Sequence, residues 1–186
     1  MPSLTVVPLS LSGVLEITPP RFADERGFFS ETYNHEAFAA HGLAETFVQD
    51  NHALSRRRGT FRGLHYQLPP RAQGKLLRAI HGSFLDIVVD IRRTSPTFGK
   101  WLGIEISADR WNQVYVPPGF AHGYLTLEDD TAVAYKVTDV YSQPHERGIR
   151  FDDPAIGIVW PMTADEMLLS AKDRAAPLLA DAELFD

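Results

Sequence analysis

The feature that most constrains the fold is a series of short apolar segments separated by glycine, proline, aspartate and serine. Residues 75–83, 84–91, 112–118 and 131–138 are examples, and several of them alternate apolar with polar positions. Many short runs rich in Val, Ile, Thr, Phe and Tyr are typical of an antiparallel sandwich or barrel. Helices of crossover length do not follow each strand, which disfavours a parallel α/β sheet. We therefore predict a mainly β fold, a β-barrel.

Helical signals are few and short. Residues 35–42 form one helix-like segment ended by Gly42, and the tail contains one or two more, because Thr163 followed by Glu166 resembles a capping box. The 186 residues amount to about one domain, and we see no linker or repeat. We predict a single domain, residues 1–186, with a barrel over about 13–162 and a helical C-terminal segment over about 163–186.

Charge and composition exclude several classes of function. The formal net charge of −6 argues against a large nucleic-acid surface, although a small basic pocket remains compatible with it. The absence of cysteine excludes disulfides and a thiolate nucleophile, and it fits a reducing compartment. We find neither a signal peptide nor an apolar run near the ~18 residues of a membrane span. We expect a cytoplasmic protein without a membrane or nucleic-acid partner.

Residues 59–82 place several bases among apolar residues that look like buried strands. Strand alternation puts Arg62 and His65 on opposite faces unless Gly63 or a bulge re-aims one of them, and Lys75 lies ten residues after His65. A lone histidine is more often at the surface or bonded to a backbone carbonyl. Cations among apolar residues are costly without a counter-charge, however. This cluster therefore favours an anionic ligand.

Four other segments carry candidate side chains, none of them decisive alone. A tyrosine or histidine in a strand more often serves packing than chemistry. The candidates are His122 after the rigid turn at 117–119, Tyr135 and Tyr141 along one strand and its end, Lys172 with Asp173, and Arg26 with Glu31 around two phenylalanines.

A metal site is disfavoured. Metal-binding barrels of the cupin type carry a His-x-His element followed by a glutamate, and later a Pro-x-Gly-x-x-His block. The second block matches at residues 117–122, but the first offers only His65, with Gln67 two residues later. A catalytic metal normally has three protein ligands. We expect a site without metal or cofactor, in which His, Lys, Tyr and Arg perform acid–base chemistry.

Nine blocks in order resemble the dTDP-4-dehydrorhamnose 3,5-epimerase family of the cupin superfamily, from about residue 13 to about residue 179. They are DERGFFSE, FVQDN, GTFRGLHYQ, AQGKLLR, DIVVDIRRTSPTFGKW, VPPGFAHGY, YKVTDVYS, FDDPAIGIVWP and LLSAKDRAAPLL. The resemblance implies a jelly-roll barrel and a homodimer. It also implies conversion of dTDP-4-dehydro-6-deoxy-D-glucose to dTDP-4-dehydro-L-rhamnose, with inversion at C3 and C5 through enolates.

The resemblance also implies roles for individual residues. His65 matches the general base, Tyr135 the general acid and Asp173 the carboxylate that orients the base. Lys75 matches the cation beside the 4-keto oxygen, and Tyr141 the aromatic side chain that stacks on thymine. The other positions implied to bind nucleotide, diphosphate or sugar are Arg26, Glu31, Gln49, Asp50, Asn51, Arg62, His122, Glu146 and Lys172.

Two alternatives remain at this stage. A sister enzyme that inverts only C3 or only C5, or that uses another nucleotide, would keep His65, Asp173 and Lys75, so these residues do not separate the two activities. A non-catalytic cupin that binds sugar nucleotides has no reason to keep His65, Tyr135 and Asp173 together. The combination therefore favours an epimerase.

Overall fold

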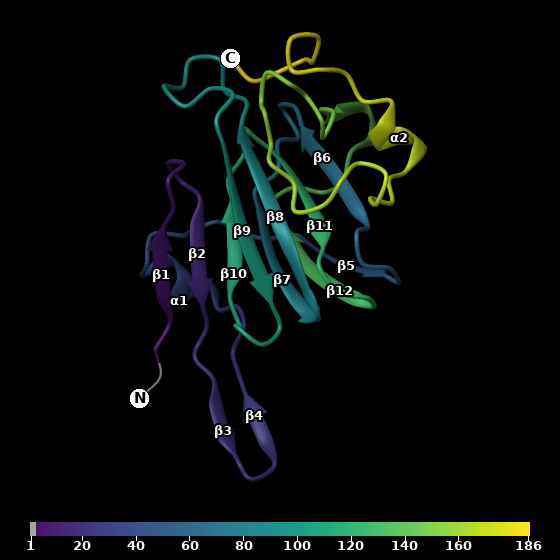
Figure 1. The fold of residues 1–186 in the computed structure, drawn as a ribbon. Coiled ribbons are helices and arrows are strands. Elements are labelled where there is room, and N and C mark those ends of the chain that lie inside the picture. Colours follow the sequence, from purple (N-terminus) through teal and green to yellow (C-terminus); the bar gives the residue numbers. More distant parts are fainter. Residues whose placement is uncertain (1–2) are drawn as a thin grey trace.

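A computed structural model describes residues 3–186 and shows two antiparallel sheets that face each other (Figure 1). The six-stranded sheet has the order β1 (Thr5–Pro8), β2 (Leu15–Thr18), β10 (Gln113–Val116), β7 (Lys75–His81), β12 (Thr131–Val137), β5 (Gln49–Ser55). The five-stranded sheet has the order β13 (Glu146–Gly148), β6 (Phe61–Gln67), β11 (Phe120–Thr126), β8 (Ser83–Asp90), β9 (Trp101–Ser107). This jelly-roll arrangement confirms the predicted mainly β fold. The barrel begins before residue 13, because β1 pairs with β2.

Between the sheets, one part of the interior is filled by apolar side chains from both. Leu77, Phe84, Val114 and Val133 are all buried there. Burying such a side chain stabilises the fold by about 1.5–3 kcal/mol. Residues two apart along a strand share a face, so the same alternation also directs polar side chains inward. These inward polar residues are Lys75 on β7, Asp86 on β8, His122 on β11 and Tyr135 on β12.

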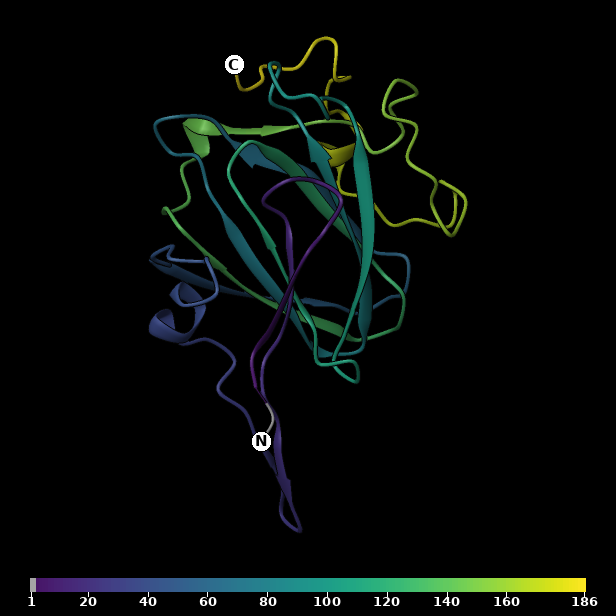
Figure 2. The same ribbon diagram turned by 90° about the vertical axis from the view of Figure 1, so that its left-hand side faces the viewer.

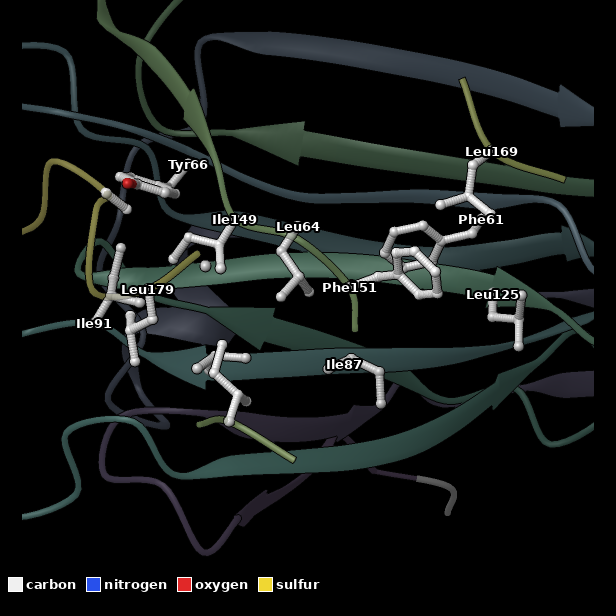
Figure 3. Packing of buried hydrophobic residues seen from close by; sticks show 14 of the residues in the cluster. Phe61, Leu64, Tyr66, Ile87, Ile91, Leu125, Ile149, Phe151, Leu169 and Leu179 are labelled. Atoms are coloured by element: carbon white, nitrogen blue, oxygen red, sulfur yellow. The ribbon is translucent and has the colours of Figure 1, made fainter. Parts of the chain in front are cut away.

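The outer face of the five-stranded sheet is covered by the C-terminal part of the chain. Figure 3 shows Phe151 and Leu169 beside Phe61, and Ile149 near Leu64. Met167, Leu179 and Ala182 belong to the same buried cluster. The sheet thus lies between the barrel interior on one side and the tail on the other, which fixes the position of its strands around the site.

The helical content of the tail is confined to α2 (Ala171–Arg174). Thr163 and Glu166 do interact, since the Thr163 N–H and hydroxyl donate to Glu166 Oε2 at 2.7 and 2.8 Å. They close a turn that no helix follows. The reason lies in the packing, because the buried residues Met167 and Leu169 are two apart, which suits an extended chain and not a helix. The tail is therefore less helical than its sequence predicts.

The predicted helix near residue 35 is present as α1 (His35–Ala39), and Gly42 follows it at φ +88°. Its Phe38 packs with Leu76 and Tyr115 on the outer face of the six-stranded sheet. Within residues 3–186 we find no helix with the length and apolar character needed to span a bilayer.

A hairpin of β3 (Phe22–Asp24) and β4 (Gly27–Phe29) extends away from the body of the molecule, at the end opposite α2 (Figures 1 and 2). The side chains of Phe28 and Phe29 remain largely in solvent, with 51% and 68% of the residue surface exposed. This hairpin carries Arg26 at its tip.

Candidate active site

A bulge in β6 brings Arg62 and His65 onto one face. Gly63 and Leu64 together oppose the single residue Gly123 of β11, which is the two-against-one pattern of a bulge. A Cβ at Gly63 would lie 2.5 Å from the Gly123 Cα, and Gly63 has φ +141°, so glycine is required there. Leu64 joins the outer core. Arg62 and His65 lie opposite the inward-facing Tyr124 and His122 of β11, so they share the inner face. The bulge predicted as a condition for their convergence is present.

His65 is held by a carboxylate from the C-terminal tail. Its Nε2 lies 2.7 Å from Asp173 Oδ1, and the two side chains are 29% and 5% exposed. Asp173 is placed by α2, whose N-cap Ser170 accepts the Asp173 N–H at 3.1 Å. Burial raises the pKa of Asp173, but hydrogen bonds from His65 and Ser170 outweigh it, and the pKa lies below its ordinary value. The ionised carboxylate therefore favours the tautomer with Nε2–H, which leaves Nδ1 as the free base.

Lys75, at the start of β7, lines the same cavity as His65. Its Nζ donates to the His65 carbonyl oxygen at 3.4 Å. Burial lowers the pKa of Lys75 to about 8, while Asp86 and Glu146 oppose this change. An ammonium with this pKa is still charged near neutrality.

Tyr135 adds a phenol from β12. Burial raises the pKa of Tyr135, although nearby Arg62 opposes the shift, so the phenol keeps its proton near neutrality. A cavity of about 130 Å³ places this phenol with His65 and Lys75, which come from two other strands. The full lining is His65, Tyr66, Gln67, Gln73, Lys75, Tyr135, Tyr141 and Glu146.

A hydrogen-bonded rim closes one side of this cavity. The Tyr141 hydroxyl donates to Glu146 Oε2 at 3.0 Å, and Lys172 forms an ion pair with the same carboxylate at 2.5 Å. The Tyr141 N–H donates to Gln49 Oε1 at 2.9 Å, and Gln49 in turn donates to Asn51 at 2.8 Å. Tyr141 stays exposed, with 54% of the residue surface in solvent.

A second imidazole–carboxylate pair lies deeper in the barrel. His122 Nε2 is 2.5 Å from Asp86 Oδ1, and the side chains are 6% and 0% exposed. Burial lowers the pKa of His122, against the opposing charge of Asp86. The structure thus brings His122 close to the predicted site, but as a buried partner of a carboxylate.

Gln67, at the position of the missing second histidine, uses its side chain to shape the rim. Its amide nitrogen donates to the Arg71 carbonyl oxygen at 2.6 Å, and its amide oxygen accepts the Ser142 N–H at 2.8 Å. No group of three metal-ligating side chains occurs among residues 3–186. In the described part of the chain, the site therefore has no cluster of side chains suited to bind a metal ion.

Three predicted residues are not brought into this cluster. Arg26 lies on the β3–β4 hairpin and pairs with Asp24 at 2.5 Å, and Glu31 follows the same hairpin. Asp50 lies between inward-facing Gln49 and Asn51, so strand alternation turns it to the outer face, where it faces Lys136 at 3.3 Å. All three therefore lie outside the cavity within a single chain, and their role in binding nucleotide, diphosphate or sugar stays a prediction.

The sequence reasoning missed Asp86. The signal was present, because a carboxylate in the middle of an otherwise apolar buried strand is costly and needs a partner. That partner, His122, was itself singled out.

The comparison with known families decides the classification. A family model described as dTDP-4-dehydrorhamnose 3,5-epimerase matches residues 8–181. The chain belongs to this family. The resemblance carried by the nine sequence blocks is thus confirmed, and so is the activity class, an epimerase.

Individual members of the family show the same likeness. A dTDP-4-dehydrorhamnose 3,5-epimerase from Sinorhizobium fredii is 48% identical over 93% of this chain and 88% of its own length. A dTDP-6-deoxy-D-glucose-3,5-epimerase from Legionella pneumophila, solved with dTDP-4-keto-L-rhamnose, has a TM-score of 0.91 and 39% identity over 96% of this chain and 94% of that one. A 3′-monoepimerase from Streptomyces bikiniensis, solved with dTDP-quinovose, has a TM-score of 0.86 and 36% identity over 93% and 87% of the two chains.

Proposed function

We propose that this epimerase converts dTDP-4-dehydro-6-deoxy-D-glucose to dTDP-4-dehydro-L-rhamnose by inverting C3 and C5. The observation that carries the proposal is the single cavity in which three groups converge, namely an imidazole held by a carboxylate, an ammonium and a phenol. Removal and return of a proton beside a ketone can use these groups as base, enolate stabiliser and acid.

His65 is the base in this proposal. Its Nδ1 takes the C–H proton next to the ketone, a task that suits imidazole near neutral pH. The Asp173 carboxylate, 2.7 Å from Nε2, holds the ring and stabilises the imidazolium that forms.

Lys75 stabilises the enolate. Once the proton leaves, negative charge moves onto the 4-keto oxygen, where a fixed ammonium is most effective in a site that excludes water. Losing one such donor typically costs about 3 kcal/mol in the barrier.

Tyr135 returns a proton from the other face of the sugar ring. Inversion requires a donor opposite the base, and the Tyr135 phenol lies on β12 while His65 lies on β6 of the facing sheet. Its raised pKa keeps the phenol protonated until the enolate forms.

The nucleotide lies along the rim. The guanidinium of Arg62 suits a diphosphate, because it pairs phosphate oxygens bidentately. Tyr141 stacks on the thymine ring, and Lys172, Glu146, Gln49 and Asn51 supply polar contacts to nucleotide or sugar. His122, which lies deeper in the barrel, supplies a further polar contact to nucleotide or sugar.

The protein acts as a homodimer in this proposal. The β3–β4 hairpin exposes Phe28 and Phe29, and contacts with a second copy would bury them. Arg26 and Glu31 would then reach the partner's site, which explains why they lie outside the cluster of their own chain. Sedimentation equilibrium should give a dimer. A monomer at micromolar concentration would contradict this arrangement.

We also propose that the reaction needs neither metal nor cofactor and takes place in the cytoplasm. The side chains around His65 support a reaction without metal. Nε2 of His65 is hydrogen-bonded to Asp173, and the Gln67 side chain forms hydrogen bonds with backbone groups. The absence of cysteine from the chain supports a reducing compartment.

The decisive experiment is product analysis with dTDP-4-keto-6-deoxyglucose in D₂O. Inversion at both centres should introduce deuterium at C3 and C5, and a downstream reductase should yield a dTDP-L-rhamnose product. Deuterium at one carbon would instead identify a single-centre epimerase, as the similarity to the 3′-monoepimerase allows. No exchange at either carbon would overturn the proposed activity.

A further inference from the structure

One buried glutamine holds the backbone on both sides of Tyr141. The Gln67 amide nitrogen donates to the Val140 carbonyl oxygen at 3.3 Å, and its amide oxygen accepts the Ser142 N–H at 2.8 Å. The same nitrogen donates to the Arg71 carbonyl oxygen at 2.6 Å. Gln67 is only 3% exposed, so these bonds are shielded from water. Breaking them would leave buried polar groups without partners, which favours this one backbone arrangement.

The segment that Gln67 holds, residues 138–145, connects β12 to β13. The structure describes all eight residues, and none of them is buried. Besides the bonds to Gln67, the Tyr141 N–H donates to Gln49 Oε1 at 2.9 Å and the Tyr141 hydroxyl donates to Glu146 Oε2 at 3.0 Å. The position of Tyr141 therefore depends on hydrogen bonds to the barrel more than on apolar packing.

Gln67 serves this segment and not a ligand. Both hydrogens of its amide are used in bonds to backbone carbonyl oxygens, so the side chain has no donor left. Gln67 nevertheless lines the cavity with His65, which lies two residues earlier on β6 and on the same strand face. One face of one strand therefore carries both the imidazole and the amide that holds Tyr141.

We propose that Gln67 is a positioning residue for nucleotide binding, which places the Tyr141 ring in register with His65 by holding the backbone on both sides of Tyr141. The proposal rests on the proposed function, in which Tyr141 stacks on thymine while His65 meets the sugar. A ligand that binds at two places gains affinity when both are ordered before it arrives, because less ordering remains to be done on binding.

The first test concerns the backbone and needs no substrate. Gln67→Met keeps a similar length and removes the hydrogen bonds. The Ser142 N–H loses its acceptor, so its amide hydrogen should exchange with solvent about tenfold faster or more, as NMR can measure. Unchanged exchange at Ser142 in the folded variant would overturn the proposal.

A companion measurement uses the wild-type protein, so it holds even where Gln67→Met does not fold. The side-chain amide hydrogens of Gln67 are buried and bonded, and they should exchange slowly. Exchange at the rate of an exposed glutamine would show that these bonds do not persist in solution and would refute the role of Gln67.

The matched control is Thr131→Val. Thr131 is fully buried, and its hydroxyl donates to the carbonyl oxygens of Ser83 and Glu128 at 3.2 and 2.9 Å. It begins β12, about 20 Å from the end that leads into residues 138–145, by the rise of about 3.3 Å per residue. This variant also loses buried hydrogen bonds to the backbone, but exchange at Ser142 and affinity for dTDP should stay as in the wild type. Equal changes in both variants would mean a general loss of stability.

Binding and turnover give the functional readout. Gln67→Met should weaken dTDP binding about threefold to tenfold, the factor commonly lost with one hydrogen bond. With dTDP-4-keto-6-deoxyglucose, KM should rise by a similar factor while kcat stays within about twofold, the pattern of an interaction made equally in the ground and transition states. A large fall in kcat with an unchanged KM would contradict a role in nucleotide binding.

The closing experiment measures dTDP affinity by calorimetry in Gln67→Met, Tyr141→Ala and the double variant. If Gln67 acts through Tyr141, the double variant should bind as Tyr141→Ala does, because the two changes remove one and the same interaction. Losses that multiply would overturn the proposal. If Tyr141→Ala loses affinity and Gln67→Met does not, the proposal fails while stacking on Tyr141 stands. If neither variant loses affinity, stacking on Tyr141 itself fails, and the role of Gln67 in binding fails with it.

Discussion

The barrel holds two imidazole–carboxylate pairs of the same chemistry in different surroundings. His65 and Asp173 join a strand to the tail at the edge of a cavity, with 29% of the imidazole exposed. His122 and Asp86 join two adjacent strands inside the barrel, with 6% of the imidazole exposed. Exposure decides which imidazole can meet a substrate.

The difference teaches how one pair of residue types serves two purposes. In the proposed mechanism, the carboxylate at the cavity edge prepares a base that accepts a proton from the substrate. In the interior, the imidazole forms a hydrogen bond with a buried carboxylate. The proposed mechanism therefore uses the first pair to move a proton, whereas the second pair stays buried.

The largest expected effect breaks the first pair. His65→Ala removes the base, and both epimerisation and solvent exchange should fall by about 10⁴-fold or more, at the upper end of general-base contributions. His122→Gln should retain measurable exchange, because His122 does not receive the proton. Equal loss of exchange in the two variants, in proteins shown by circular dichroism to be folded, would erase the distinction between the pairs.

A smaller effect is expected from the carboxylate of the first pair. Asp173→Asn cannot stabilise the imidazolium, so kcat should fall by roughly 10²- to 10³-fold. Because the pKa of Asp173 is already below its ordinary value, the wild-type carboxylate is ionised throughout the neutral range, and the loss should be similar from pH 6 to 8. The basic limb of the pH profile, set by Lys75, should stay in place. A basic limb that shifts in Asp173→Asn would contradict the separate roles of Asp173 and Lys75.

Tyr141 lies outside both pairs and tests binding alone. Tyr141→Ala should weaken dTDP binding by about 1–3 kcal/mol, the range found for bases stacked on aromatic side chains. Tyr141→Phe removes the hydrogen bond to Glu146 but keeps the ring, so it should bind almost as the wild type does. Calorimetry measures both affinities. Full affinity in the alanine variant would rule out stacking at this position.

The smallest effect is expected from removal of metal. Both imidazoles direct Nε2 to a carboxylate, so dialysis against a strong chelator should leave the rate unchanged. Activity lost on dialysis and restored by Zn²⁺, Fe²⁺ or Mn²⁺ would show that a metal takes part.

Much of the fold follows from local sequence patterns. Strand alternation and turn residues indicate the barrel, and the requirement for a bulge at Gly63 follows from the spacing of Arg62 and His65. The extent of helix in the tail does not follow, because the turn at Thr163 and Glu166 looks locally like a helix start. Packing against the outer sheet face decides in favour of an extended path.

The site divides in the same way. Residues on one strand face can be assigned from alternation, and His65, Lys75 and Tyr135 do converge. Asp50 marks the limit of this reasoning, because a matching sequence block does not show which of Gln49, Asp50 and Asn51 point inward. Arg26 lies on a projecting hairpin and Glu31 follows it. In the proposed arrangement their function depends on a second chain, which no local pattern describes.

The most direct test of the proton-transfer mechanism is an NMR time course of Tyr135→Phe with substrate in D₂O. This variant keeps the ring and removes the phenolic hydroxyl, so His65 can still form the enolate and return deuterium to the same face. The mechanism predicts loss of the C3 or C5 proton signal with little inverted product. Epimerisation at the wild-type rate would contradict the assignment of the acid, and continued exchange in His65→Ala would contradict the assignment of the base.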